Sequence, residues 1–202
     1  MSREKVGLYG GTFDPIHFGH LNLAIEMMEA HRLNRLWFCP AALSPHKTET
    51  LLTPAQHRLN MLRLALEQFP CCEILDSEIT RDSPSYTVDT VRQCVNDPKN
   101  KDKEFYLILG EDCLACFDRW KNSEEIVSSV SLLIGSRGKR QQALKLGMEN
   151  LDEAIARGLT PMHNFEISST DVRERLSKGR YCGHLVPAKV LDYICKNKLF
   201  FT

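Results

Sequence analysis

The sequence predicts an α/β fold, a Rossmann-like doubly wound parallel sheet with a small C-terminal helical extension. Short apolar runs recur along the chain with helical segments between them, and each run ends at Gly, Pro or a polar turn. The runs are apolar throughout, which is typical of strands covered on both faces of a parallel sheet. A chain of 202 residues is long enough to bury the core of one α/β domain. We therefore expect one domain over residues 1–202, with the helical part at about 168–202.

The apolar runs give the expected strands: Val6–Tyr9, Leu36–Cys39, Glu73–Leu75, Phe105–Leu109 and Ser131–Ile134. The segments between and after them give the expected helices: Gly19–His31, Pro54–Phe69, Thr87–Asn96, Lys139–Arg157, Thr170–Ser177 and Pro187–Lys196. Pro54 and Pro187 fit first-turn positions, where a helix does not need the missing N–H. Because parallel sheets bind ligands beyond the carboxyl ends of their strands, functional residues should cluster just after the apolar runs.

Composition and charge argue against several classes of protein. Lys and Arg together count 26, as do Asp and Glu, so the chain has no net charge and no long basic run that would attract nucleic acid. No apolar stretch approaches the roughly 18 residues that span a bilayer. We therefore expect a cytoplasmic protein that binds neither nucleic acid nor membrane. Its eight cysteines follow no secretory signal and are expected to stay reduced.

Cys113 and Cys116 have the spacing of a redox or metal site. No second Cys/His pair completes a zinc site, and Leu114 and Phe117 indicate a packed helical turn. We expect structural thiols here, since reduced cysteine behaves as a small hydrophobic residue. A redox protein that uses this pair stays open as an alternative.

The segment between the first strand and the first helix is Gly10-Gly11-Thr12-Phe13-Asp14-Pro15-Ile16-His17-Phe18-Gly19-His20. Paired glycines let the backbone approach a charged ligand, and the helix presents unpaired N–H groups and the positive end of its dipole. If Gly19 begins the helix, His17 and His20 lie on neighbouring faces of its first turn, and both can donate to phosphate oxygens. The segment is neither a Walker loop nor a dehydrogenase fingerprint. The alternative is a Gly-rich turn with two capping histidines.

This segment resembles the GGTFDPxHxGH signature of bacterial nicotinate-mononucleotide adenylyltransferases, which belong to the HxGH nucleotidyltransferase superfamily. Later segments resemble the same family in the expected order and extend the resemblance over nearly the whole chain. They are Pro40–Lys47, Pro84–Thr90, Gly110–Asp112 with Trp120, Ile167–Arg173 and Leu185–Ile194.

The resemblance implies an enzyme that joins ATP and nicotinate mononucleotide into nicotinate adenine dinucleotide and pyrophosphate, in NAD biosynthesis. It assigns the catalytic neutralisation of phosphate charge to His17, His20, Lys47 and Arg173. It assigns ATP binding to Gly10, Gly11, Thr12, Phe13, His17, His20, Gly110, Asp112, Ile167, Ser168, Ser169, Thr170 and Arg173. It assigns the mononucleotide to Thr12, His46, Lys47, Ser85, Tyr86, Thr87 and Trp120. Mg²⁺ is expected to arrive with ATP, because no carboxylate cluster forms a dedicated metal site.

Several alternatives stay open. Lys47 fits an ordinary surface loop, the segment at Thr87 fits a Ser/Thr helix cap, and Trp120 fits a core position. Nicotinamide mononucleotide, phosphopantetheine or an alcohol phosphate could be the acceptor instead, and a nucleotide-binding regulator could keep the fold without activity. Residues 139–163 match no motif, so adenine contacts are unassigned apart from Arg137 as a candidate. A homo-oligomer is also left open.

Overall fold

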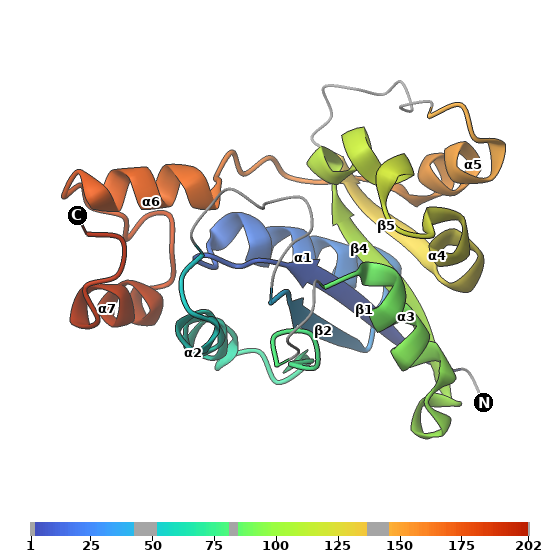
Figure 1. The fold of residues 1–202 in the computed structure, drawn as a ribbon, viewed down its shortest axis with the longest axis horizontal. Coiled ribbons are helices and arrows are strands. Elements are labelled where there is room, and N and C mark those ends of the chain that lie inside the picture. The colour runs from blue at the N-terminus through green and yellow to red at the C-terminus, as the bar shows by residue number, and fades with distance from the viewer. Residues whose placement is uncertain (1–2, 43–51, 81–84, 137–145, 202) are drawn as a thin grey trace.

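A computed structural model describes residues 3–42, 52–80, 85–136 and 146–201 of the chain. It contains a six-stranded parallel sheet flanked by helices (Figure 1). The strands are β1 (Glu4–Gly11), β2 (Arg35–Pro40), β3 (Cys72–Ile74), β4 (Lys103–Gly110), β5 (Ser131–Ser136) and β6 (Leu159–Pro161). The helices are α1 (Phe18–His31), α2 (Ala55–Leu66), α3 (Thr87–Asn96), α4 (Ser123–Ser129), α5 (Glu149–Gly158), α6 (Ser169–Ser177) and α7 (Ala188–Lys196). Two 3₁₀ helices flank β4, η1 (Pro98–Asn100) and η2 (Glu111–Arg119).

The strands follow the order β3-β2-β1-β4-β5-β6, and every pair is parallel. The central strand β1 pairs with β2 on one side and with β4 on the other, so that Leu8 lies between Trp37 and Leu107. The chain winds outward from β1 in one direction and from β4 in the other. This is the strand order of a doubly wound dinucleotide-binding sheet, and the predicted fold class is confirmed. A ligand crevice is expected at the carboxyl ends of β1 and β4, where the winding direction reverses.

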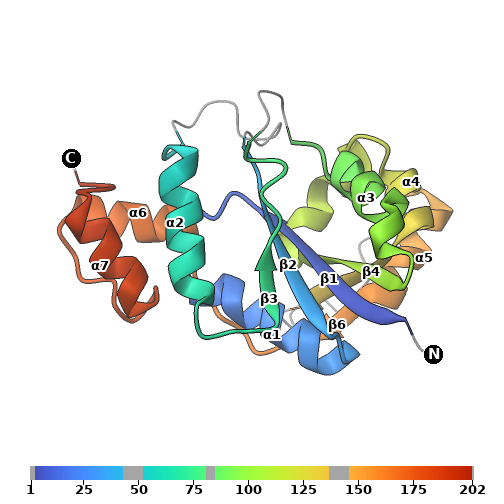
Figure 2. The ribbon, with the colours of Figure 1, turned by 90° about the horizontal axis from the view of Figure 1, so that it is seen from below.

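Each face of the sheet has its own core, because successive side chains of a strand point to opposite faces. Leu8 and Leu107 pack with α3, α4 and α5, whereas Tyr9 and Ile108 pack with α1, α2, α6 and α7. Figure 2 shows α1 and α3 on opposite sides of the strands. The prediction that both faces are covered is therefore confirmed.

The C-terminal helices α6 and α7 contribute to the same core as α1, and their residues Val172 and Ile194 are fully buried in it. Helix α7 lies beside α2 (Figure 1), and its Tyr193 hydroxyl is 2.9 Å from both His57 Nδ1 and Asn60 Nδ2 of α2. Helix α6 is joined to the loop after β1 by Ser169 Oγ, which donates to the Pro15 carbonyl, and by Arg173 Nη1, which donates to the Asp14 carbonyl. None of the described helices is long and apolar enough to cross a membrane.

The predicted helix Lys139–Arg157 is wrong at its start. Its first residues lie outside the described ranges, residues 146–148 are not helical, and α5 begins only at Glu149. The Asp152 carboxylate accepts the backbone N–H groups of Leu146 and Gly147 at 2.6 and 3.2 Å, and Gly147 has a φ of 81°. This local side-chain bonding holds the backbone in a turn before the helix. Strand β6 and helix α4 were not predicted.

Pro54 and Pro187 are the N-cap residues of α2 and α7, so each lies one residue before the predicted first-turn position. Both have extended ψ values, 140° and 143°, as an N-cap residue requires. Proline is tolerated at both positions because an N–H group there would have no partner within the helix.

Candidate active site

A cavity of about 510 Å³ opens at the carboxyl ends of β1 and β4, where the strand order predicts a ligand site. Its volume lies in the range of small-molecule sites. Most of the predicted site residues line it. They are Gly10, Gly11, Thr12, His17, His20, Ser85, Tyr86, Thr87, Gly110, Asp112, Trp120, Ile167, Ser168, Ser169 and Thr170.

The end of β1 brings bare backbone to the cavity. A Cβ atom placed on Gly10 would meet nothing within 4 Å, so this position faces open space. A Cβ atom on Gly19 would lie 3.1 Å from the His17 ring and 3.4 Å from the carbonyl oxygen of Ile167, which precedes α6. Glycine therefore lets α1 begin close beside the segment that leads into α6.

His17 and His20 form a stacked pair at the start of α1. The helix begins at Phe18, one residue before the predicted start, and His17 is its N-cap. The His17 Nδ1 atom accepts the His20 backbone N–H, and the His20 Nδ1 atom accepts the His17 backbone N–H, both at 3.3 Å. The two rings are 3.7 Å apart and inclined by 23°. The two side chains that cap the helix therefore also line the cavity.

The two hydrogen bonds also fix which ring nitrogens carry hydrogen. Because each Nδ1 atom accepts a backbone N–H, the neutral tautomer of each ring has its hydrogen on Nε2. Both Nε2–H groups can then serve as donors. Burial lowers the pKa of His17 from 6.5 to about 4, and the Asp171 carboxylate opposes this effect only in part. His17 is therefore neutral at physiological pH, and its Nε2–H group is available as a donor.

The start of α6 reaches the same end of the cavity. Ser168 is its N-cap and accepts the Asp171 N–H at 3.1 Å, while Ser169 Oγ donates to the Pro15 carbonyl at 3.0 Å. The second contact links α6 directly to the loop that follows β1. Two helices therefore direct the positive ends of their dipoles toward one place, which is a favourable environment for phosphate.

Arg173 and Phe13 do not line the cavity, unlike the other described residues that the sequence assigned to ATP. Arg173 Nη1 donates to the Asp14 carbonyl at 2.7 Å, and Nη2 donates to Thr170 Oγ1 at 3.3 Å. The Phe13 side chain is 1% exposed and packs edge-on against the His20 ring, with centroids 5.1 Å apart. Arg173 therefore holds the loop after β1 in place, and Phe13 holds the His20 ring in place.

Arg58 is a buried cation beneath this loop. Its guanidinium is 1% exposed and donates to the carbonyl groups of Thr12, Ala41, Ala42 and Thr53 at 2.6–3.1 Å. Burial lowers the pKa of Arg58, while the nearby Asp14 carboxylate raises it. One side chain thus joins the loop after β1, the loop after β2 and the start of α2. The sequence did not indicate this role, because nothing in it distinguishes Arg58 from Arg63, the other arginine of the helix.

The opposite wall of the cavity comes from α3 and η2. Tyr86 is the N-cap of α3 and makes no side-chain capping bond, so the Ser/Thr cap considered for this segment is wrong. Ser85 Oγ instead accepts the Ala42 N–H at 3.0 Å, which leaves the first-turn N–H groups of α3 without a side-chain cap. Trp120 is half-buried and packs on Phe117, with ring centroids 5.1 Å apart. This wall therefore offers an aromatic ring and the positive end of a helix.

Lys121, Met162 and Phe165 also line the cavity and were missed. The Lys121 ammonium lies 4.3 Å from the Tyr86 ring centroid and 3.3 Å from an Asp89 carboxylate oxygen. Its position directly after Trp120 could have indicated it. Phe165 is 43% exposed, an unusual exposure for an aromatic side chain so close to Ile167. The predicted residues His46, Lys47 and Arg137 lie outside the described ranges.

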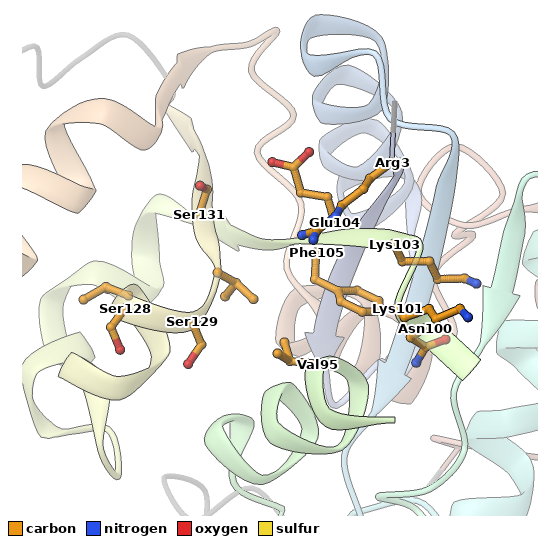
Figure 3. Close-up of a pocket in the computed structure, with 12 residues that line it drawn as sticks. Arg3, Val95, Asn100, Lys101, Lys103, Glu104, Phe105, Ser128, Ser129 and Ser131 are labelled. Carbon is orange, nitrogen blue, oxygen red and sulfur yellow. The ribbon is translucent and has the colours of Figure 1, made fainter. Parts of the chain in front are cut away.

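A second cavity of about 360 Å³ lies at the amino ends of β4 and β5, bordered by Arg3, Lys101 and Lys103 (Figure 3). The Lys103 ammonium is already paired with Glu4 and Asp102 at 3.7 Å. None of the predicted site residues lines this cavity, so we do not assign it to the candidate site. Among the described residues, no three His, Cys, Asp or Glu side chains gather into a metal site.

Comparison with known proteins agrees with this geometry. The cytidylyltransferase-like family matches residues 8–175. A Dictyoglomus thermophilum protein named probable nicotinate-nucleotide adenylyltransferase is 37% identical, over 97% of this chain and 99% of that protein. A protein of the same name from Carboxydothermus hydrogenoformans is 35% identical, over 99% of this chain and 100% of that protein. The structure of Plasmodium falciparum nicotinic acid mononucleotide adenylyltransferase complexed with NaAD has a TM-score of 0.74 at 22% identity, covering 98% of this chain and 97% of that chain.

Proposed function

We propose a function from one premise: the chain belongs to the cytidylyltransferase-like family, and within it to the nicotinate-nucleotide adenylyltransferases. It transfers the adenylyl group of ATP to nicotinate mononucleotide, forming nicotinate adenine dinucleotide and pyrophosphate for NAD biosynthesis. The observation that carries this proposal is the stacked His17–His20 pair, which lies in the cavity between the N-termini of α1 and α6. The imidazoles and the N–H groups of two helix N-termini are donors that suit a polyphosphate.

In the proposed reaction a phosphate oxygen of the mononucleotide attacks the α-phosphorus of ATP, and pyrophosphate leaves without a covalent enzyme intermediate. The protein contributes position and charge. His17 and His20 donate their Nε2–H groups to oxygens that gain charge as the P–O bond breaks. The backbone at Gly10, Gly11 and Thr12 approaches the phosphates closely, and Asp112 accepts a hydrogen bond from a ribose hydroxyl of ATP.

The mononucleotide occupies the wall formed by α3 and η2. The Trp120 ring stacks on the pyridine, and the N–H groups at the start of α3 receive the carboxylate near Thr87. Tyr86 and Ser85 complete this wall. His46 and Lys47 are assigned to the substrates on the resemblance alone, and Arg173 supports the phosphate loop through its bond to the Asp14 carbonyl.

Adenylyl transfer from ATP uses a divalent cation, and we propose Mg²⁺. The chemistry that it supplies is neutralisation of the triphosphate charge, in the manner of Mg²⁺ sites that rely on substrate phosphates. We also propose that residues 1–202 act as one nucleotidyltransferase domain in the cytoplasm, and we leave a homo-oligomer open to a sedimentation measurement.

The test is an assay of pyrophosphate release with ATP, Mg²⁺ and either nicotinate or nicotinamide mononucleotide, with the dinucleotide product identified by mass. We expect release with a strong preference for the nicotinate form. ATP binding without release would favour an inactive regulator, and a preference for another acceptor would overturn the substrate assignment.

The matched variants are His20→Ala and His184→Ala. Removing one preorganised donor lowers turnover by about 10²–10³, so His20→Ala should lose most activity while staying folded. His184 is exposed and stacks on Tyr181 away from the cavity, so its variant should keep the wild-type rate. Near-normal turnover in folded His20→Ala would refute the assigned role.

A further inference from the structure

The 3₁₀ helix η2 presents three distinct faces, because side chains three residues apart eclipse one another in this geometry. Leu114 and Phe117 form one face and are buried in the core at 3% and 0% exposure. Cys113 and Cys116 form the next face, where both are half-buried and both line the cavity. The third face is exposed and consists of Asp112, Ala115 and Asp118. The expected packed turn is therefore made by Leu114 and Phe117, while the two thiols face the substrate site.

The geometry of η2 suits a bond between these two thiols. One 3₁₀ turn rises about 2.0 Å per residue, which puts eclipsed Cα atoms about 6 Å apart. Disulfides usually join Cα atoms separated by about 4.4–6.8 Å. The Cys116 Sγ atom already lies 3.6 Å from the Cys113 carbonyl oxygen, to which it donates. Closing a disulfide needs rotation of two side chains and no large displacement of the backbone.

We propose that Cys113 and Cys116 are a dithiol modification site, which a two-electron thiol oxidant closes to a disulfide in the wall of the substrate cavity. With an azodicarboxamide such as diamide, the first sulfur adds to the N=N bond and forms an S–N bond. The second sulfur then attacks the first sulfur, and the S–N bond breaks. The S–S bond forms, both thiol hydrogens end on nitrogen, and the azo compound is reduced to a hydrazine. A dithiol reductant reverses the change by thiol–disulfide exchange.

The disulfide changes the substrate site because η2 connects its two ends. Asp112 lies at the start of η2 and Trp120 follows its last residue, and both line the same cavity as the thiols. Drawing the two sulfurs together reshapes the wall between these residues, and small displacements of positioning groups cost as much as 10²-fold in rate. Bound substrates should cover the thiols and slow the oxidation. This effect on turnover rests on the proposed function.

The experiment treats the reduced protein with diamide, with and without ATP and nicotinate mononucleotide. Intact mass and peptide mapping follow the linkage, and pyrophosphate release follows turnover. We expect the loss of two hydrogen masses, a Cys113–Cys116 link, a fall of about ten-fold or more in kcat/KM, protection by substrates and recovery with dithiothreitol. The mass measurement does not depend on the proposed function, so the two ideas can fail separately.

The variants locate the effect. Cys116→Ser and Cys116→Ala cannot form the link, so each should keep the rate of its own reduced form after diamide treatment. Cys195→Ser removes an exposed thiol of α7 and should respond to diamide as the wild type does. The proposal is overturned if no Cys113–Cys116 link forms, or if the link forms and the rate does not change.

Discussion

Replacement of Arg58 by Met should destabilise the protein strongly. The guanidinium donates to the carbonyl groups of four half-buried residues, Thr12, Ala41, Ala42 and Thr53. Leaving a buried acceptor without its donor costs about 1–3 kcal/mol, so four acceptors give about 4–12 kcal/mol as an upper sum. The cost of burying the cation, several kcal/mol, disappears with it and offsets part of this. We expect a net loss of about 3–5 kcal/mol in the free energy of unfolding.

Urea denaturation followed by circular dichroism measures this loss. Arg63→Met is the matched control on the same helix, because Arg63 makes an exposed contact of 3.3 Å to Asn60 Oδ1 and should change stability by less than about 0.5 kcal/mol. Turnover of Arg58→Met should also fall in the absence of urea, since Thr12 and Ala41 line the cavity. A folded Arg58→Met protein within about 1 kcal/mol of the wild type would show that the carbonyl groups find other donors, and would refute the reasoning.

Two further predictions concern Gly10, near the end of β1, and His17, the N-cap of α1. Gly10→Ala should keep the wild-type stability, since the new Cβ meets nothing within 4 Å, but should raise the KM for ATP about ten-fold by occupying cavity space. Gly158→Ala, whose Cβ would lie 2.6 Å from the Leu132 carbonyl oxygen, should lower stability and leave the KM unchanged; the reverse pattern would contradict both. Folding lowers the pKa of His17 from 6.5 to about 4, so the unfolded chain takes up this proton first as the pH falls. The contribution of neutral His17 to the free energy of unfolding is therefore complete above pH 6.5 and is lost toward pH 4, by about 3 kcal/mol at most. Urea denaturation at a series of pH values should show a smaller loss of stability toward pH 4 for His17→Gln than for the wild type.

The sequence predicted the fold well because its strands are fully buried and its helices are bounded by strong local signals. The apolar runs at Val6, Leu36 and Phe105 each became a central strand, and Thr87–Asn96 was predicted with its exact bounds as α3. The failures share a different cause. Strand β6 is Leu159-Thr160-Pro161, which contains no apolar run and ends in a proline, a residue that argues against a strand. The start of α5 depends on the carboxylate of Asp152, which a pattern of apolar residues does not reveal.

The candidate site divides in the same way. Segments that end strands or begin helices were placed correctly, because a sheet with one crossover hand brings all of them to the same edge. The direction of a long side chain was not predictable. Arg173 stands in a segment that resembles a phosphate motif, yet its side chain bonds to the Asp14 carbonyl. Cys113 and Cys116 line the cavity from η2, a 3₁₀ helix. An α-helix of the same sequence would rotate successive side chains differently, and the sequence does not distinguish the two.

The end of the cavity that we propose for phosphate is formed where distant parts of the chain meet. The His17–His20 pair comes from the beginning of the chain, and the second helix N-terminus comes from Ser169, which bonds to Pro15 at a separation of 154 residues. Each N-terminus contributes only near its own first turn, since the effect of a helix dipole fades within that distance. The contacts of Ser169 with the Pro15 carbonyl and of Arg173 with the Asp14 carbonyl hold the first turn of α6 beside the loop that leads to the two histidines. The same contacts that stabilise the start of α6 therefore also shape the proposed phosphate site.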